Sequence, residues 1–210
     1  PNLAAQVLNE GKTADVIVLG RGLLADPEWP NKVKEGEEER IRPCLGCQDG
    51  CLGRIFEGKP LSCAVNPACG REKEMALIPA QKSKKVSIIG GGLAGMESAR
   101  VAALRGHDVT LYEKSGQLGG HIIEASVPEF KNDEERLLDW YKGELQRAGV
   151  TVKLNTEVTL DLLKQEEPEV VIVATGSTPR DLNVPGVKKN NVIKADDLLL
   201  GKGNAGQNVL

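Results

Sequence analysis

A run of glycines between a predicted strand and a predicted helix limits most strongly how this chain can fold. Residues 90–95 read Gly-Gly-Gly-Leu-Ala-Gly and fit the pattern G-x-G-x-x-G. In this pattern Gly90 makes a tight turn, Gly92 admits a pyrophosphate, and Gly95 lets the helix pack closely on the strand. The context predicts a Rossmann-like dinucleotide-binding domain; the alternative is an ordinary strand–turn–helix without a ligand.

An acidic residue follows the glycine run at the expected distance. Glu113 ends a predicted strand 18 residues after Gly95, close to the spacing of roughly 20 residues expected for a ribose-binding acid. A carboxylate there accepts hydrogen bonds from ribose hydroxyls and repels a 2′-phosphate. FAD or NAD is therefore favoured over NADP.

Two further turns are predicted to lie against the cofactor. The first follows Glu113 within seven residues, and the second follows the last predicted strand. The residues concerned are Gly119, Gly120, Ala174, Thr175 and Gly176. Each turn alone could be a plain turn, but glycine also lets the backbone approach a ligand closely. Together with Glu113 they resemble the two-dinucleotide flavoproteins, in which the first such domain holds FAD.

Regular alternation of strands and helices runs through residues 84–210. Strands are predicted at 85–89, 108–113, 150–154 and 169–174, and helices at 93–104, 133–147 and 160–164. Such alternation predicts an α/β fold with a doubly wound parallel sheet. The helix at 133–147 supports this, because Leu138, Tyr141 and Leu145 fall on one face.

A cysteine-rich segment precedes this domain. Cys44, Cys47, Cys51 and Cys63 form the pattern C-x2-C-x3-C-x11-C within residues 37–83. Thiolates are soft ligands that suit zinc or an iron–sulfur cluster. Structural zinc usually takes two separated C-x2-C pairs, whereas three close cysteines and a distant one suit a [4Fe-4S] cluster. Zinc and disulfides remain alternatives, and the remaining Cys69 is interpreted as a small buried thiol.

The first 36 residues predict a helix, a strand, a loop and a second helix. The continuous apolar run at 14–19 is typical of a strand buried on both faces of a parallel sheet. Because residues 1–36 contain no neighbouring strand, we expect a poorly packed remnant of a larger α/β domain.

Composition and charge exclude several classes of function. Lys and Arg number 27 against 30 Asp and Glu, a net charge of −3, and both signs are scattered. This predicts neither a nucleic-acid groove nor a basic membrane patch. No apolar run approaches the roughly 20 residues of a membrane span, and no signal peptide is recognisable. We therefore expect a cytoplasmic protein. His107 and His121 have no evident partner and are not interpreted as catalytic bases.

Three strings carry a resemblance to a known family. They are residues 20–30 (GRGLLADPEWP), 42–47 (RPCLGC) and 63–67 (CAVNP), followed by the glycine run. In this order they resemble the bacterial 2,4-dienoyl-CoA reductase, enoate reductase and trimethylamine dehydrogenase family over the whole chain. The resemblance implies a parent enzyme with an FMN-binding (β/α)8 barrel, a [4Fe-4S] cluster, and an FAD domain into which a nicotinamide domain is inserted.

The resemblance also implies a division of this chain and roles for its residues. Residues 1–36 would be the last unit of the barrel, 37–83 the cluster loop, and 84–210 the first part of the FAD domain. A nicotinamide-binding domain would begin near Val209. Gly20, Arg21 and Gly22 would hold the FMN phosphate, the four cysteines the cluster, and Gly90, Gly92, Gly95 and Glu113 the FAD.

The parent enzyme is accordingly expected to transfer a hydride from NAD(P)H to FAD. Electrons would then pass from FAD through the cluster to FMN, and FMN would reduce an activated C=C bond of a small substrate. The chain would contain no catalytic residue for that substrate and be inactive on it alone. Two alternatives remain: an amine dehydrogenase of the same family with ADP in the FAD position, and a non-catalytic, zinc-stapled nucleotide-binding module. The sequence predicts no particular oligomeric state.

Overall fold

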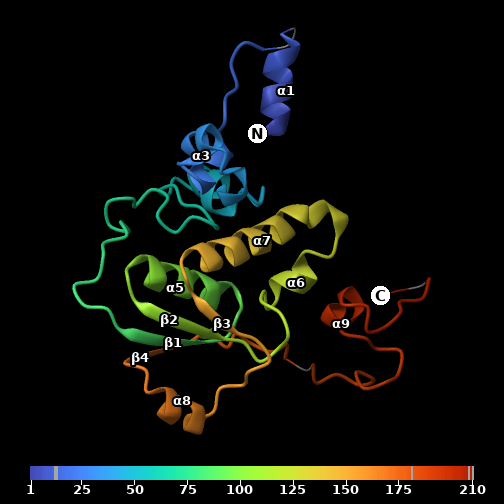
Figure 1. Cartoon of the computed structure of the whole chain (residues 1–210). Helices are drawn as coiled ribbons and strands as arrows, with labels where there is room; N and C mark the ends of the chain where they lie inside the picture. Colours follow the sequence, from blue (N-terminus) through green and yellow to red (C-terminus); the bar gives the residue numbers. More distant parts are fainter. Residues whose placement is uncertain (12–13, 181, 208, 210) are drawn as a thin grey trace.

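A four-stranded parallel sheet forms the centre of the fold (Figure 1). The computed structural model describes residues 1–11, 14–180, 182–207 and 209. The strands are β1 (Lys85–Ile89), β2 (Asp108–Tyr112), β3 (Thr151–Lys153) and β4 (Val170–Val173), in the order β3-β2-β1-β4. All pairings are parallel, and the predicted α/β class with a Rossmann-like sheet is confirmed.

The central strand β1 is buried because it has a neighbour on both edges. Val86 is 4% exposed and Ile88 0% exposed, and both pack into the core. On β4, which is paired on one edge only, Val170 and Ile172 pack against the core while Val173 is exposed. One face of the sheet therefore carries the main apolar core.

Two long helices cover that face, and a shorter helix lies on the opposite side of the sheet (Figure 1). The long helices are α5 (Leu93–Leu104) and α7 (Asn132–Arg147), and the shorter helix is α8 (Leu160–Glu166). Each helix connects consecutive strands or follows one, as a doubly wound sheet requires. The buried residues of α7 are Leu137, Leu138, Trp140, Tyr141 and Leu145, which include the face predicted from the sequence.

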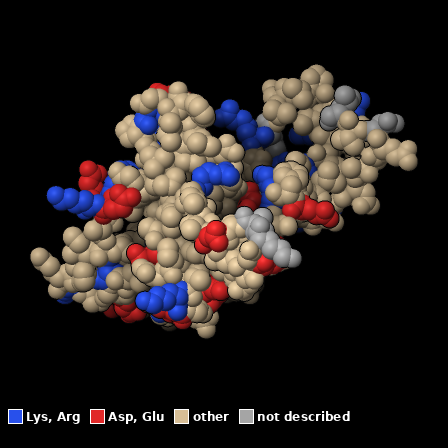
Figure 2. All heavy atoms as spheres, turned by 90° about the horizontal axis from the view of Figure 1, so that it is seen from above, with Lys and Arg blue, Asp and Glu red and all other residues tan. Residues whose placement is uncertain are grey.

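Acidic and basic side chains are interspersed over the face seen from above in Figure 2. On α7 several of them form ion pairs within the helix, for example Arg136 with Asp133 and Lys142 with Asp139. Such exposed pairs contribute little stability each. Among the described residues, no helix has both the length and the apolar character needed to cross a membrane.

The cysteine-rich segment has no strand among its described residues. Its short helical turns are η1 (Glu38–Arg40), η2 (Asp49–Gly53), which is a π-helix, and α4 (Arg54–Phe56). It lies between the N-terminal helices and the sheet domain in Figure 1. This loop-built organisation agrees with the absence of a periodic apolar pattern there.

The N-terminal residues match the prediction in part: the two expected helices form, but the expected strand does not. They form α1 (Asn2–Glu10), α2 (Arg21–Ala25) and α3 (Trp29–Glu35). The strand predicted at 14–19 is wrong: these residues are not in a strand, and Val16 and Val18 are 72% and 88% exposed. A strand needs hydrogen-bonding neighbours, and no described strand lies beside this segment.

Among the described residues after residue 84, two short α-helices were not predicted, namely α6 (Ile122–Ala125) and α9 (Ala195–Leu199). At the C-terminal end, Asn208 and Leu210 lie outside the described residues. The expected start of a new strand near Val209 therefore falls in part outside the description.

Candidate functional site

The glycine turn between β1 and α5 has the geometry that its predicted role requires. Gly90 has a φ of 109°, and a methyl group on it would lie 2.3 Å from the Ala174 carbonyl oxygen. A methyl group on Gly95 would lie 1.8 Å from the Gly90 oxygen. By contrast, the nearest atom to a methyl group on Gly92 would be 4.0 Å away. Gly90 and Gly95 thus permit close packing, while Gly92 borders open space.

The N-terminus of α5 is available to an anion. Its N-cap residue is Gly92, which has no side chain that could cap the helix. The first backbone N–H groups of a helix lack partners within the helix and point along its positive end. This is the arrangement in which helix N-termini bind phosphate groups.

Glu113 lies directly beside the glycine turn. Its Oε2 accepts a hydrogen bond from the Gly91 N–H at 2.6 Å, and its Oε1 accepts one from the Ser115 N–H at 2.8 Å. Partial burial opposes ionisation, but these two backbone hydrogen bonds hold the pKa of Glu113 below its ordinary value. The carboxylate is therefore ionised at neutral pH and able to accept hydrogen bonds from hydroxyl groups.

The two predicted loops meet at the same edge of the sheet. The Gly119 N–H donates to the Gly91 oxygen at 2.9 Å, and Gly119 forms an isolated parallel bridge with Gly92. A methyl group on Gly120 would lie 3.1 Å from the Gly92 Cα. Ala174 leads into the other loop, with its N–H bonded to the Ile89 oxygen at 2.8 Å. Thr175 and Gly176 follow it there, so the predicted cofactor-binding residues of this domain lie together.

The prediction that the histidines have no evident partner is wrong. The His107 Nδ1 accepts a hydrogen bond from the Lys84 N–H at 3.2 Å. The His121 ring contacts Glu124 Oε1 at 2.9 Å through Nδ1 and the Ser177 oxygen at 3.0 Å through Nε2. The Ser177 contact joins residues that lie 56 positions apart, which no local pattern indicates.

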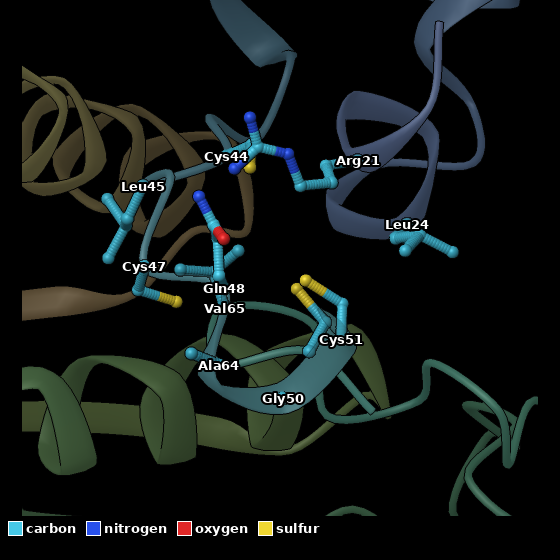
Figure 3. A pocket seen from close by; sticks show the side chains of 11 residues that line it. Arg21, Leu24, Cys44, Leu45, Cys47, Gln48, Gly50, Cys51, Ala64 and Val65 are labelled. Carbon is cyan, nitrogen blue, oxygen red and sulfur yellow. The ribbon is translucent and has the colours of Figure 1, made fainter. Parts of the chain in front are cut away.

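The four predicted ligand cysteines line one small pocket (Figure 3). These residues are Cys44, Cys47, Cys51 and Cys63, and all are free thiols. Two arms of the loop lie against each other, because the Ser62 N–H donates to the Gly50 oxygen at 2.8 Å. A methyl group on Gly50 would lie only 2.9 Å from the Ser62 oxygen. This close contact places neighbouring cysteines of the two arms around the same space.

In the part of the chain that the structure describes, no three His, Cys, Asp or Glu side chains are grouped around a single metal position. Cys69 does not line the cavity and is 3% exposed, as its interpretation as a buried thiol predicts. Burial and then the proximity of Cys63 raise the pKa of the Cys69 thiol.

Arg21 lies at the same cavity. It begins α2 between Gly20 and Gly22, and its side chain reaches towards Cys44 in Figure 3. Of the three residues predicted for an FMN phosphate, the structure therefore brings Arg21 next to the cysteines. The α2 turn that presents Arg21 was not predicted from the sequence.

The segment that leads into the cysteines is fixed from two sides. The buried Asp26 carboxylate accepts hydrogen bonds from the Arg42 N–H at 2.7 Å and from Lys32 Nζ at 2.6 Å. On the other side, the Trp140 Nε1–H donates to the Arg40 oxygen at 2.7 Å, and the Arg42 guanidinium lies 4.5 Å from the centre of the Trp140 ring. Trp140 of the sheet domain thus positions the cysteine segment, a role that sequence reasoning missed.

The parallel sheet, the glycine turn and the ionised acid define a dinucleotide-binding domain. The sequence matches the pyridine nucleotide-disulphide oxidoreductase family over residues 59–167 and 84–202. The chain belongs to this family.

Individual relatives agree with the resemblance predicted from the sequence. The cinnamate reductase of Clostridium sporogenes is 50% identical over 210 residues, which are 100% of this chain and 31% of that protein. The structure of a 2-naphthoyl-CoA reductase complex aligns with a TM-score of 0.93 and 38% identity over 98% of this chain and 31% of that one. Histamine dehydrogenase from Rhizobium sp. 4-9 aligns with a TM-score of 0.83 and 26% identity over 97% of this chain and 31% of that one. The chain thus spans about a third of the length of these relatives.

Proposed function

We propose that this chain is the electron-transfer part of a cytoplasmic, NAD(P)H-dependent iron–sulfur flavoprotein that reduces an activated C=C bond. The observation that carries the proposal is the combination, in one chain, of four free thiols around one cavity with a dinucleotide turn and an ionised acid. FAD when bound takes up a hydride and releases electrons singly, which suits a one-electron [4Fe-4S] carrier and a second flavin.

The cysteine cavity fits a cluster better than a single metal ion. Zinc in a structural site draws four ligands to one point at about 2.3 Å per Zn–S bond. Its usual ligand pattern is two separated C-x2-C pairs, whereas here three cysteines lie within eight residues and the fourth follows 12 residues later. A [4Fe-4S] cluster, which carries an iron atom for each cysteine, accepts such a spacing. Cys44, Cys47, Cys51 and Cys63 would each bind one corner as thiolates.

The dinucleotide residues fit FAD. Gly92 leaves room beside the N-terminus of α5 for a pyrophosphate, and Glu113 would accept hydrogen bonds from ribose hydroxyls. Gly119 and Gly120 would form one wall of the site, and residues 174–176 the other. The work of these residues is to bind and orient the cofactor, and none of them is proposed to react.

Arg21 would serve FMN. A guanidinium flanked by the backbone N–H groups of Gly20 and Gly22 suits a phosphate. Because Arg21 lines the same cavity as the four cysteines, it supports an FMN site beside the cluster. In the full-length protein, this would shorten the path between the cluster and FMN.

Reduction of a C=C bond is preferred over amine oxidation because of the relatives' similarity. The cinnamate reductase and the 2-naphthoyl-CoA reductase are 50% and 38% identical to this chain, whereas the histamine dehydrogenase is 26% identical. The second candidate is therefore an amine dehydrogenase that carries ADP in place of FAD. A zinc-stapled binding module is less compatible with membership of an oxidoreductase family.

The nucleotide that the protein binds tests this proposal. Acid treatment of the purified chain, followed by chromatography of the released nucleotide, should yield FAD. Gly92→Ala, whose methyl group would fill the proposed pyrophosphate space, should yield much less FAD. Release of ADP would favour the amine dehydrogenase, and absence of any nucleotide, even after incubation with FAD, would contradict a cofactor site here.

A further inference from the structure

The two contacts of His121 place a chemical requirement on its ring. Nδ1 lies 2.9 Å from a carboxylate oxygen of Glu124, and Nε2 lies 3.0 Å from the carbonyl oxygen of Ser177. Both partner atoms are hydrogen-bond acceptors. A neutral imidazole has one N–H, whereas an imidazolium has two. Both hydrogen bonds can therefore form together only when His121 is protonated.

The ring connects two loops at the edge where the dinucleotide turn lies. His121 follows Gly120 directly and caps α6. Ser177 follows the loop that begins at Ala174 after β4. The first loop is bonded to Gly91, and the Ala174 oxygen lies against Gly90. The hydrogen bond between His121 and Ser177 therefore holds the loop at Gly119–Gly120 and the loop after β4 together, and both loops border the glycine turn.

The charged groups near the ring favour its protonated form. The Ser177 hydrogen bond, and then the hydrogen bond to Glu124, raise the pKa of His121 above its ordinary value of 6.5. Asp196 on α9 adds a further negative charge with the same effect. The ring is 61% exposed, so it can exchange protons with solvent freely.

We propose that His121 is a cofactor-positioning residue whose imidazolium holds the loop at Gly119–Gly120 and the loop after β4 together as the two walls of the FAD site. The inference rests on the proposed function, because it takes FAD as the occupant. A neutral ring has one N–H, so it bonds to Ser177 only in the tautomer that carries the proton on Nε2. In the other tautomer the loops are no longer joined and can separate. A smaller fraction of molecules then has the closed arrangement, and the apparent affinity falls with that fraction.

The direction of the pH effect follows from the raised pKa. Both hydrogen bonds of His121 are present below its ordinary pKa of 6.5 and persist above that pH. One of them is lost as pH rises through the higher value in the folded protein. With one hydrogen bond lost, the FAD dissociation constant should rise about fivefold across this window.

Flavin-fluorescence titrations between about pH 6 and pH 9 test the proposal. The wild type should bind FAD more weakly as pH rises. His121→Gln should bind FAD more weakly than the wild type at low pH, and its FAD affinity should not change with pH. His107→Gln is the matched control, because His107 is the other of the chain's 2 histidines. It should keep the wild-type dependence of FAD affinity on pH. An unchanged profile in His121→Gln would overturn the role of His121 and leave the proposed function intact.

A second measurement does not depend on FAD or on the folding of His121→Gln. In His107→Gln, the nitrogen NMR signals of the one remaining imidazole report its protonation directly. They should show that the ring keeps its second proton above its ordinary pKa of 6.5, and Glu124→Gln should lower this pKa. A His121 pKa at or below 6.5 would overturn the proposal. If the imidazolium were present but FAD bound at no pH, the proposed function would fail, and the cofactor role of His121 with it.

Discussion

The packing of α5 on the glycine turn can be tested by adding one methyl group. In Gly95→Ala the new Cβ would lie 1.8 Å from the Gly90 oxygen and 3.5 Å from Leu111 Cδ1. Helix α5 would have to move away from the turn, yet its Met96 and Ala99 are each 0% exposed and fixed in the core. Overpacking of such a core costs about 1–3 kcal/mol. Because the new methyl group strikes a backbone atom, we expect Gly95→Ala to lower the free energy of unfolding by about 3 kcal/mol.

Gly92→Ala provides the matched control. Its Cβ would have its nearest neighbour at 4.0 Å, and its φ of −76° suits any residue. The gain from a less flexible unfolded chain and the small loss at an N-cap position nearly cancel, within about 1 kcal/mol. This variant should therefore keep its stability and lose FAD binding.

Urea unfolding followed by Trp140 fluorescence measures both variants. Trp140 is 4% exposed on α7, and a Trp29→Phe background removes the other tryptophan. At an unchanged slope, the loss of stability appears as a lower midpoint. A loss below about 0.5 kcal/mol in Gly95→Ala, or an equal loss in both variants, would refute the reasoning that the two glycines have different roles.

Two further variants test contacts described above. Glu113→Gln should raise the FAD dissociation constant about tenfold, since it removes hydrogen bonds made to a charged group. Because the pKa of Glu113 is lowered in the folded protein, the wild type should also lose stability relative to this variant as pH falls below about 4.5. The same loss of unfolding free energy with falling pH in both proteins would contradict this. Trp140→Phe should lower the free energy of unfolding by about 1–2 kcal/mol, because the hydrogen bond to the Arg40 oxygen is lost. Limited proteolysis of residues 37–83 should become faster. An unchanged cleavage rate would show that Trp140 does not hold the segment.

The sheet domain was predictable because its sequence signals are local. Strand β1 and helix α5 begin and end at the predicted residues, since an apolar run, a glycine turn and a glycine at 106 mark them in sequence. The tight turn expected at Gly90 and the close packing expected at Gly95 agree with the structure, because a side chain at either position would strike the backbone. The apolar run at 14–19 misled for the opposite reason. Its pattern is local, but a strand also needs partners elsewhere in the chain.

Other parts of the candidate site depend on contacts that sequence spacing does not encode. Trp140 bonds to a residue 100 positions away, and His121 to one 56 positions away. The sequence marked Trp140 only as part of a helix and His121 only as a histidine without an evident partner. The common cavity of the four cysteines was foreseeable from their spacing, whereas the place of Arg21 beside them depends on the unpredicted α2.

The iron and acid-labile sulfide content of the chain, purified without oxygen, tests the central claim most directly. The account predicts about four irons and four sulfides per chain and a brown visible spectrum. Cys51→Ser should lose most of this iron, while Cys69→Ser, which changes a thiol outside the cavity, should retain it. Zinc without sulfide would contradict the account and favour a zinc-stapled binding module.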